Sequence, residues 1–168
     1  MITIRPVHLS DIKGIQHVAR SSWMDTYREI YPIEYIESFL KQAYSADQLE
    51  QSIIRDQQLE ARRFLVAVSA ETEELAGYVH VMKENDECYE LLRVYLLPSY
   101  QGTGIGTSLL NEVSTLNQIS HLKAWVEEQN LSARRFYEAK GFIIVGEEIE
   151  KNEGFTTKLL CYDNKKSC

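Results

Sequence analysis

A strand that runs directly into a glycine-rich turn and then into an amphipathic helix constrains this chain most. The stretch is LLRVYLLPSYQGTGIGTSLL at 91–110, where Pro98 closes the strand pattern before Gly102, Gly104 and Gly106. Glycine adopts positive φ values and lets a ligand approach the backbone closely. The first amides of the following helix lack intrahelical partners and carry partial positive charge. The stretch therefore predicts a binding site for a phosphate or pyrophosphate.

Two common nucleotide-binding motifs do not fit this turn. A P-loop requires a lysine followed by serine or threonine after its last glycine, and no lysine follows these glycines. A dinucleotide-binding fingerprint has the spacing G-x-G-x-x-G and usually opens the fold. Here Gly106 arrives one residue early, and the turn lies past the middle of the chain.

A third motif fits the turn. QGTGIG at 101–106 resembles the Q/R-x-x-G-x-G/A motif of the GNAT superfamily of N-acetyltransferases, which holds the pyrophosphate of coenzyme A. The resemblance implies acetyl-CoA as co-substrate and backbone hydrogen bonds from the preceding strand to its pantetheine arm. The alternative is an ordinary turn between a strand and a helix. The residues implied in cofactor binding are Val94, Tyr95, Leu96, Gln101, Gly102, Thr103, Gly104, Ile105, Gly106 and Thr107.

A second stretch, WVEEQNLSARRFYEAKGF at 125–142, resembles the N-x-x-A-x-x-F-Y-x-x-x-G-F motif of the same superfamily. Asn130, Ala133 and Tyr137 are spaced i, i+3 and i+7, so they share one stripe of a helix. The resemblance implies that all three border the cofactor and that Tyr137 protonates the departing thiolate. A positioned phenol can donate into developing negative charge. Phe136 is assigned to the core.

The periodicity of the whole chain predicts the element order βααβββαβαββ. Strands joined both by hairpins and by helices imply an α/β (α+β) fold with a mixed sheet covered by helices on both faces. The resemblance adds that the sheet is mostly antiparallel and that residues 1–168 form one acyl-CoA N-acyltransferase (GNAT) domain. Ser10 is expected to cap the first helix. Strands are expected at 2–5, 64–69, 75–82, 88–97, 121–128, 142–150 and 155–162, and helices from about 11–29, 33–41, 46–59, 105–117 and 130–140.

The amine must lose a proton before it attacks a thioester. Some members of the superfamily carry a general-base glutamate four residues before the pantetheine-binding segment, and Glu90 stands there relative to Val94. Four strand residues span roughly 13 Å, so the proton would pass through water. The alternative is a carboxylate that faces solvent.

The acceptor site is expected in the first helices. SWMDTYREIYP at 22–32 resembles a run in bacterial members that include spermine/spermidine acetyltransferases. Trp23, Tyr27 and Tyr31 are the predicted substrate-binding residues, with core packing as the alternative. Asp25 and Glu29 are assigned to a solvated helix face.

Charge and composition exclude several other classes of protein. The net charge of −7 argues against general nucleic-acid binding and is compatible with a cationic substrate. No apolar run approaches the roughly 20 residues of a membrane helix, and the N-terminus lacks a signal-peptide pattern. A cytoplasmic protein is therefore expected. Cys88, Cys161 and Cys168 form no metal-binding pattern with the histidines, so no metal is expected.

The sequence thus predicts an N-acetyltransferase in which a primary amine attacks acetyl-CoA directly within a ternary complex. A polyamine or another small amine is the preferred acceptor. A protein N-terminus or lysine is the enzymatic alternative, and a CoA-binding sensor without turnover is the alternative of another class. The resemblance also implies a homodimer that associates through the C-terminal strands.

Overall fold

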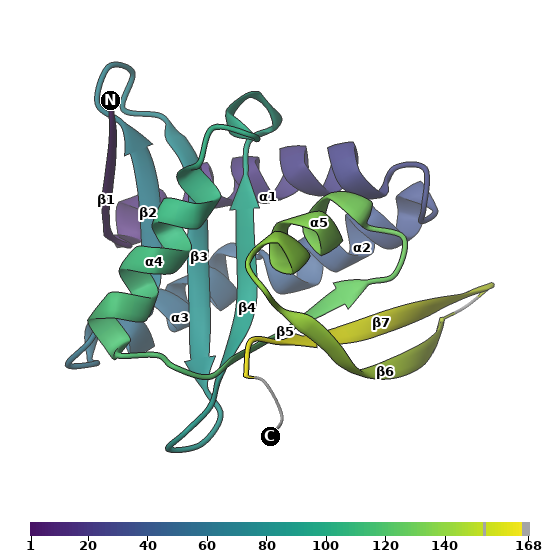
Figure 1. Ribbon diagram of the computed structural model, residues 1–168. Coiled ribbons are helices and arrows are strands. Elements are labelled where there is room, and N and C mark those ends of the chain that lie inside the picture. Colours follow the sequence, from purple (N-terminus) through teal and green to yellow (C-terminus); the bar gives the residue numbers. More distant parts are fainter. Residues whose placement is uncertain (153, 166–168) are drawn as a thin grey trace. The chain divides into compact units, whose positions relative to one another are not determined.

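The computed structural model describes residues 1–152 and 154–165 (Figure 1). Its helices are α1 (Ile12–Tyr27), α2 (Ile33–Ala43), α3 (Ala46–Gln57), α4 (Ile105–Asn117) and α5 (Leu131–Ala139), with short 3₁₀ turns η1 (Leu9–Asp11) and η2 (Pro98–Tyr100). Its strands are β1 (Ile2–Pro6), β2 (Phe64–Ser69), β3 (Leu75–Lys83), β4 (Tyr89–Leu96), β5 (Leu122–Glu127), β6 (Ile143–Asn152) and β7 (Phe155–Asp163). The predicted order of the seven strands is confirmed, and the helical region written as one element after the first helix is two helices, α2 and α3, as the expected ranges 33–41 and 46–59 indicate.

The chain divides into two compact units. The first unit comprises residues 1–81 and 93–118, and the second comprises residues 82–92 and the chain from residue 119 onward. Strand β4 contributes to both units, because its first residues belong to the second and its last residues to the first. Cys168 lies outside the described residues.

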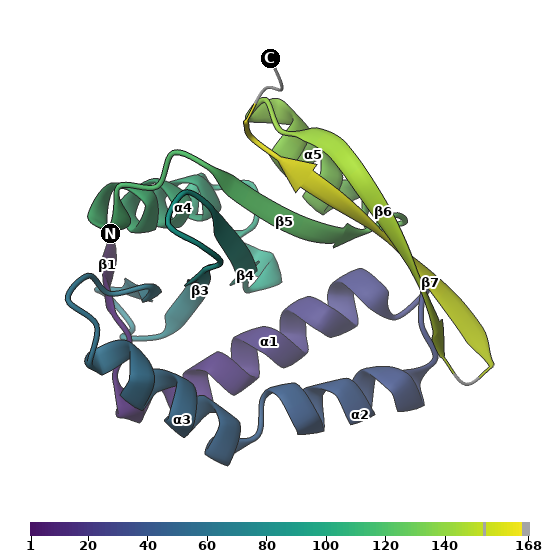
Figure 2. The same cartoon turned by 90° about the horizontal axis from the view of Figure 1, so that it is seen from below.

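The sheet of the first unit carries its strands in the order β1, β2, β3, β4. β2 pairs antiparallel with β1 from Pro6↔Leu65 to Ile2↔Ser69, and antiparallel with β3. The stretch from Phe64 to Ala67 is buried on both faces of the sheet, with at most 1% of any side chain exposed. Such a strand needs cover on both sides. Helix α4 lies on one face and α1, α2 and α3 lie on the other (Figure 2).

The helical spacing predicted in the sequence places the buried faces of α1 and α4. In α1, Ile15, Val18 and Ala19 are fully buried, and α1 lies alongside α2 (Figure 2). In α4, Leu109 and Val113 are fully buried. In both helices the buried apolar residues are three or four positions apart, so they form a stripe that faces the core.

The helical spacing of Ile105, Leu109, Val113 and Leu116 predicts that all four share one buried face of α4, which is wrong for Leu116, because its side chain is 45% exposed. The neighbouring Asn117 is the residue of the last turn that reaches back to the protein. Its side-chain amide donates to the carbonyl of Arg62 at 3.0 Å and to the carbonyl of Val113 at 3.0 Å. A polar tie therefore replaces the predicted apolar contact at the end of the helix.

The start of α1 also differs from the prediction. Ser10 lies inside η1 and does not cap the helix, which begins at Ile12. The buried carboxylate of Asp11 accepts two hydrogen bonds from the guanidinium of Arg5, at 2.8 and 2.9 Å, and one from the backbone N–H of His8 at 2.7 Å. The helix start is thus fixed by a contact with strand β1, which no local cap pattern reveals.

The second unit carries its strands in the order β4, β5, β7, β6. β4 pairs with β5 in parallel over three residue pairs, from Tyr89↔Leu122 to Leu91↔Ala124, whereas β7 is antiparallel to both β5 and β6. The predicted mixed sheet is confirmed. One face, here called the α5 face, carries Tyr162, whose ring lies 5.8 Å from the ring of Tyr137 in α5. The residues on the opposite face include Lys123, Trp125, Glu127, Leu159 and Cys161.

We predict that Asp11→Asn lowers the free energy of unfolding by about 2–3 kcal/mol at pH 7, because it breaks a largely buried ion pair. Burial raises the pKa of Asp11, but the hydrogen bonds from Arg5 and the His8 N–H outweigh it and lower the pKa below its ordinary value. A carboxyl with a lowered pKa stabilises the fold above its unfolded pKa of about 3.9 and loses that contribution as the pH falls through the folded pKa. The difference between wild type and variant should therefore narrow below about pH 4.

Urea unfolding at several pH values measures this difference. Glu37→Gln is the matched control, since it removes the carboxylate of the exposed Arg20–Glu37 pair and should change stability much less. A pH-independent difference between wild type and Asp11→Asn would contradict the assignment.

Candidate active site

The end of β4 approaches β3 unusually closely at Gly77. A Cβ atom on Gly77 would lie 2.3 Å from Leu96 Cδ2 and 2.5 Å from the carbonyl oxygen of Tyr95. Just beyond, the N–H of Leu97 donates to the carbonyl of Ala76 at 2.8 Å. Only glycine allows this approach, and it fixes the predicted pantetheine-binding segment 94–96 against its neighbour. The sequence analysis did not single out Gly77, although a glycine inside a strand is a known signal of close backbone approach.

The glycine-rich turn has the backbone shape that the sequence predicted. Gly102 has φ 76° and Gly104, the residue before α4, has φ 87°. These left-handed values favour glycine. A Cβ atom on either residue would meet nothing within 4 Å, so the backbone of the turn borders open space. The side chain of Thr103 closes the turn by donating to the carbonyl of Tyr100.

The first turn of α4 is suited to an anion. No acidic residue stands in that turn, and no side chain caps the helix. Helix N-termini present backbone N–H groups and a partial positive charge. Ile105 and Gly106 are buried toward the protein, so these two residues offer their backbone rather than a side chain. The residues present therefore fit a diphosphate group held by main-chain amides.

In the second unit, Asn130 caps α5. Its side-chain oxygen accepts the N–H of Ala133 at 3.1 Å. Gly141 follows the end of the helix with φ 87°, the left-handed stop that a glycine at this place in the sequence predicts. The capping role of Asn130 is thus observed, whereas its cofactor contact stays a prediction.

Tyr137 is the buried residue of α5, at 6% exposure. Its ring lies 5.2 Å from that of Phe136, 5.4 Å from that of Phe142 and 5.8 Å from that of Tyr162. Phe136, which the sequence assigned to the core, is only half-buried and lies under the ammonium group of Lys140 at 4.6 Å. The packing holds the Tyr137 ring in one place, and its catalytic role stays a prediction.

A hydrogen-bond network that the sequence analysis missed ties α5 to β7. The hydroxyl of Tyr162, on a fully buried residue, accepts from Arg134 Nε at 3.0 Å and donates to the carboxylate of Glu138. Arg134 also donates to the carbonyl of Glu128 at 3.1 Å. Arg134 and Glu138 flank Tyr137 on the helix, so the network fixes the helix turn that carries the predicted acid. The pair at i and i+4 was the only sequence signal for it.

Glu90 lies on β4 directly across from Lys123 of β5. Burial raises the pKa of its carboxyl, the nearby Glu84 raises it further, and Lys123 lowers it. Glu90 is half-buried rather than fully solvated, and this burial is what raises its pKa. Its role as general base stays a prediction.

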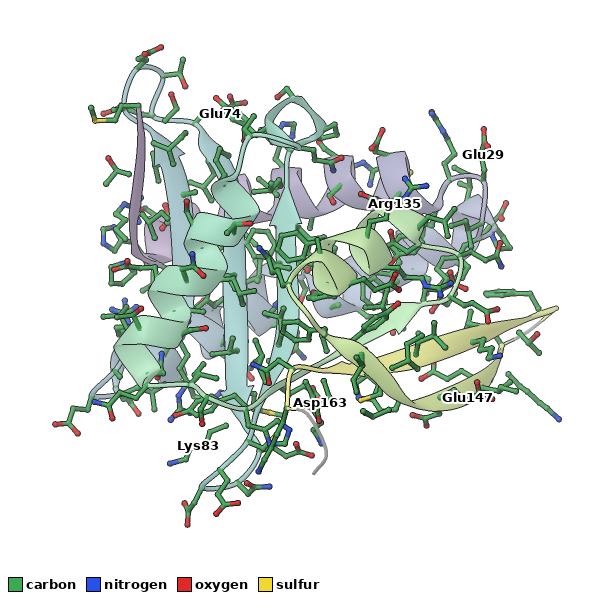
Figure 3. The ribbon with its side chains drawn as sticks, viewed as in Figure 1. Glu29, Glu74, Lys83, Arg135, Glu147 and Asp163 are labelled. Atoms are coloured by element: carbon green, nitrogen blue, oxygen red, sulfur yellow. The ribbon has the colours of Figure 1, made fainter. Side chains whose placement is uncertain are left out.

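The predicted acceptor residues come together in one aromatic stack. Trp23 lies 4.5 Å from Tyr27 and 4.1 Å from Phe39, and Tyr27 lies 5.1 Å from Tyr31, between ring centroids. Trp23, Tyr27 and Tyr31 are each at most 8% exposed, which fits the core-packing alternative, while the indole N–H of Trp23 is buried without a hydrogen-bond partner. Glu29 is exposed near the end of α1, as predicted (Figure 3).

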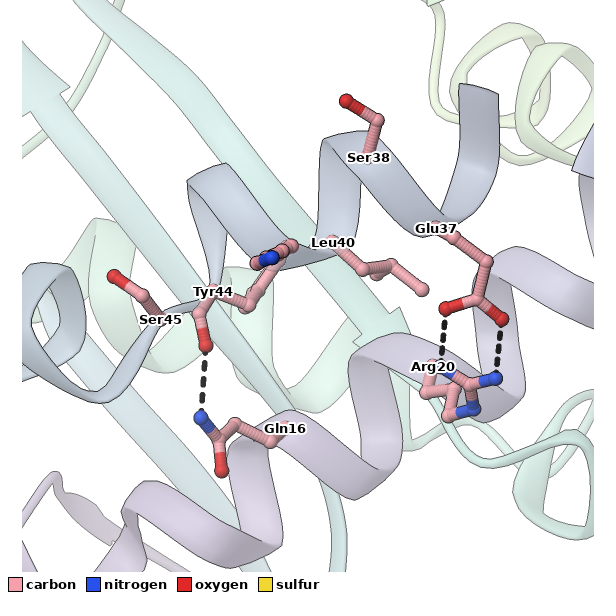
Figure 4. A pocket seen from close by; sticks show the side chains of 8 residues that line it. Gln16, Arg20, Glu37, Ser38, Leu40, Tyr44 and Ser45 are labelled. Carbon is pink, nitrogen blue, oxygen red and sulfur yellow. Dashed lines mark hydrogen bonds and ion pairs between the residues drawn. The ribbon is translucent and has the colours of Figure 1, made fainter. Parts of the chain in front are cut away.

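A groove of about 710 Å³ lies between α1 and α2, away from these predicted residues. The Gln16 side chain donates to the carbonyl of Tyr44 at one end, and the Arg20–Glu37 ion pair closes the other (Figure 4). None of the sequence-predicted site residues lines the groove. It is therefore not the candidate active site.

Burial favours the neutral form of the His80, Cys88 and Cys161 side chains. His80 stacks on Phe64, and burial, helped by Arg93, lowers its pKa to about 3, so it remains neutral at physiological pH. Cys88 and Cys161 are buried, and burial raises the pKa of each thiol. Across the described residues, no three His, Cys, Asp or Glu side chains gather as a metal site would require. In the same part of the chain, no helix is long and apolar enough to span a membrane.

Comparisons with known proteins match both the chain and its fold. The model of the acetyltransferase (GNAT) domain matches residues 26–157. Spermidine N(1)-acetyltransferase of Thermoplasma acidophilum is 35% identical over 144 residues, which cover 84% of this chain and 88% of that protein. The crystal structure of PaiA N-acetyltransferase from the same organism, in complex with coenzyme A, superposes with a TM-score of 0.79 at 32% identity and covers 99% of both chains. The yncA structure of Salmonella typhimurium, with acetyl-CoA, shares the fold with a TM-score of 0.74 at 18% identity over 100% of this chain and 96% of that one.

We predict that Gly77→Ala weakens coenzyme A binding by roughly tenfold, because the added Cβ must displace the carbonyl of Tyr95. Isothermal titration with coenzyme A measures the effect. Gly14→Ala is the control: the atoms nearest its Cβ would belong to the side chain of Leu75, at 3.2 Å for Cδ2 and 3.4 Å for Cβ, and not to the backbone of β4, so binding should stay unchanged. Equal affinities for both variants would show that the approach of β3 to β4 does not shape the binding segment.

Proposed function

This chain belongs to the GNAT acetyltransferase family, and on that premise we propose that it transfers the acetyl group of acetyl-CoA to a primary amine of a polyamine such as spermidine. It is an acetyl-CoA-dependent N-acetyltransferase. The observation that carries the proposal is the glycine turn before α4, whose open main chain and uncapped helix start suit a diphosphate.

The proposed reaction is a direct transfer within a ternary complex. The neutral amine attacks the thioester carbonyl, a C–N bond forms and the C–S bond breaks. The segment 94–96 offers backbone groups beside the carbonyl. Tyr137 gives its phenolic proton to the departing thiolate, a role for which a phenol with a pKa of about 10 is suited. The proton of the attacking amine leaves to Glu90 through water, or to solvent.

Three observations support a small cationic acceptor. The relative with 35% identity is named a spermidine N(1)-acetyltransferase. The chain carries a net charge of −7, which attracts cations. Trp23, Tyr27 and Tyr31 gather as an aromatic stack on α1 and the turn after it, and aromatic rings attract ammonium groups at their faces. We propose this stack as one wall of the acceptor site.

We further propose that residues 1–168 act as one catalytic domain in the cytoplasm, without a metal ion. We also propose that the protein pairs through the C-terminal strands as a homodimer. Gel filtration with light scattering tests the homodimer directly.

An acceptor screen tests the function. We predict that the wild-type protein releases free coenzyme A thiol from acetyl-CoA with spermidine or spermine, and that mass spectrometry finds the acetylated amine. Mono-amines should react with a higher KM, because they offer one ammonium group for recognition rather than several. Binding of coenzyme A without thiol release across polyamines, peptides and lysine would instead identify a sensor, and release with peptides alone would identify a protein acetyltransferase.

We predict that Tyr137→Phe lowers kcat by about 10²–10⁴-fold, the usual contribution of a positioned general acid, while the affinity for coenzyme A changes little. Steady-state kinetics and isothermal titration measure the two quantities. Tyr89→Phe is the matched control in the same unit, since it removes a phenol that has no proposed role. A kcat equal to that of the control would remove Tyr137 from the mechanism.

A further inference from the structure

Two polar residues of the second unit are buried on the sheet face opposite α5. Glu127, at the end of β5, is 4% exposed, and Thr157 of β7 is 3% exposed. Glu127 pairs with Leu159 across the antiparallel strands, and Thr157 stands two residues from Leu159. The pleat of the strand therefore directs both side chains to the same face. Diagonal neighbours of this kind lie roughly 7–8 Å apart, close enough for one small group to contact both.

The charge of Glu127 and the hydroxyl of Thr157 both lack a partner among the described residues. The Glu127 carboxylate accepts the backbone N–H of Gln129 at 2.6 Å. In the described part of the chain, no lysine, arginine or histidine forms a salt bridge with it. The hydroxyl of Thr157 is buried and has no hydrogen-bond partner among residues 1–152 and 154–165. Buried polar groups in native proteins are nearly always hydrogen-bonded, so this pair calls for an explanation.

Burial raises the pKa of Glu127, and the neighbouring Glu128 raises it further, whereas the amides of Gln129 and Asn130 lower it. Burying an unpaired carboxylate is costly unless a partner of opposite charge arrives. The turn before α5 does not need the charge, because an amide oxygen would accept the Gln129 N–H equally well. The acidic group is therefore unexplained by the local turn.

The strand end that carries Glu127 extends beyond the β4–β5 pairing. The parallel pairing of β5 with β4 ends at Leu91↔Ala124, so among the described pairs the last residues of β5, Trp125 to Glu127, have none with β4. The backbone after Glu127 leads within three residues to Asn130, the cap of the helix that carries Tyr137. The carboxylate thus lies at the end of β5 that pairs with β7 but, among the described pairs, not with β4, in the chain segment that leads to the predicted acid.

We propose that Glu127 and Thr157 form the subsite that holds an ammonium group of the amine acceptor, an inference that rests on the acetyltransferase function proposed above. An ammonium group donates three hydrogen bonds and carries one positive charge. The Glu127 carboxylate accepts one and neutralises the charge, and the Thr157 hydroxyl oxygen accepts a second. One ammonium group thus neutralises the Glu127 charge and supplies a hydrogen-bond donor to the Thr157 hydroxyl. The subsite therefore selects cations over neutral or anionic acceptors.

Kinetics of three variants test the subsite. Glu127→Gln keeps the acceptor for the Gln129 N–H but removes the charge, and it should raise the KM for spermidine by about tenfold or more while the KM for acetyl-CoA stays within about twofold. Thr157→Val should raise the KM for spermidine by about threefold or more. Glu148→Gln is the control, since Glu148 pairs with Leu159 from the other side, lies on the same face and is exposed. It should behave as wild type.

Thermal unfolding separates binding from structure. A buried hydroxyl without a partner destabilises the fold, so Thr157→Val should keep or raise the Tm while it weakens amine recognition. A lower Tm together with an unchanged KM for spermidine would show that the hydroxyl is purely structural and would overturn its part in the subsite.

Calorimetry with spermidine in the presence of coenzyme A distinguishes failure of the subsite from failure of the proposed function. If wild type binds spermidine and Glu127→Gln binds at least about tenfold more weakly, the subsite stands even where turnover is absent. Absence of thiol release with bound spermidine would refute the enzymatic proposal alone. Equal binding by Glu127→Gln and Glu148→Gln, or no binding by wild type, would overturn the subsite.

Discussion

The contact between Gly77 and the end of β4 is the constraint on which the geometry of the glycine-rich turn before α4 depends. Because residue 77 has no side chain, the carbonyl of Tyr95 and the side chain of Leu96 lie where a Cβ atom would otherwise stand. The bond from the Leu97 N–H to the Ala76 carbonyl then fixes where the strand stops. From that point the chain has only η2 and two left-handed glycines before α4 begins. The direction in which the first amides of α4 point is therefore set by packing inside the sheet.

In the second unit, polar contacts hold α5, the helix that carries Tyr137, in place. Tyr137 lies on a helix of only nine residues, which would be marginal on its own. The side chain of Asn130 holds its beginning, and the Arg134–Tyr162–Glu138 network holds its middle against β7. The proposed proton donor, Tyr137, needs a helix that does not fray, since small displacements of a catalytic group reduce catalysis strongly. The network around the buried Tyr162 thus supplies rigidity where the hydrophobic contact area of a short helix is small.

The sequence predicted most of the elements because their signals are local. The glycine motif, the 105–117 helix and the Asn130 cap depend on residues within one turn or strand, and all three appear in the structure as expected. The predictions are wrong where contacts between residues distant in the sequence determine the local structure. Arg5 binds Asp11 and so overrides Ser10 as the helix start, and Asn117 bonds to Arg62 in place of an apolar contact by Leu116. The sequence also did not indicate the roles of Gly77, Tyr162 and Glu127. Their roles depend on strand pairing, which a single sequence does not show.

The position of β7 between β5 and β6 has a consequence for how the protein is made. Synthesis on the ribosome proceeds from the N-terminus, so this central strand emerges after both of its neighbours. Until then β5 and β6 have no common partner, and unpaired strand edges invite association between chains. Tyr162 also arrives with β7, so the clamp on α5 closes only at the end of translation. A nascent or prematurely terminated chain can thus complete the glycine turn before the contacts of Tyr162 with α5 exist, and it leaves β5 and β6 without their common partner.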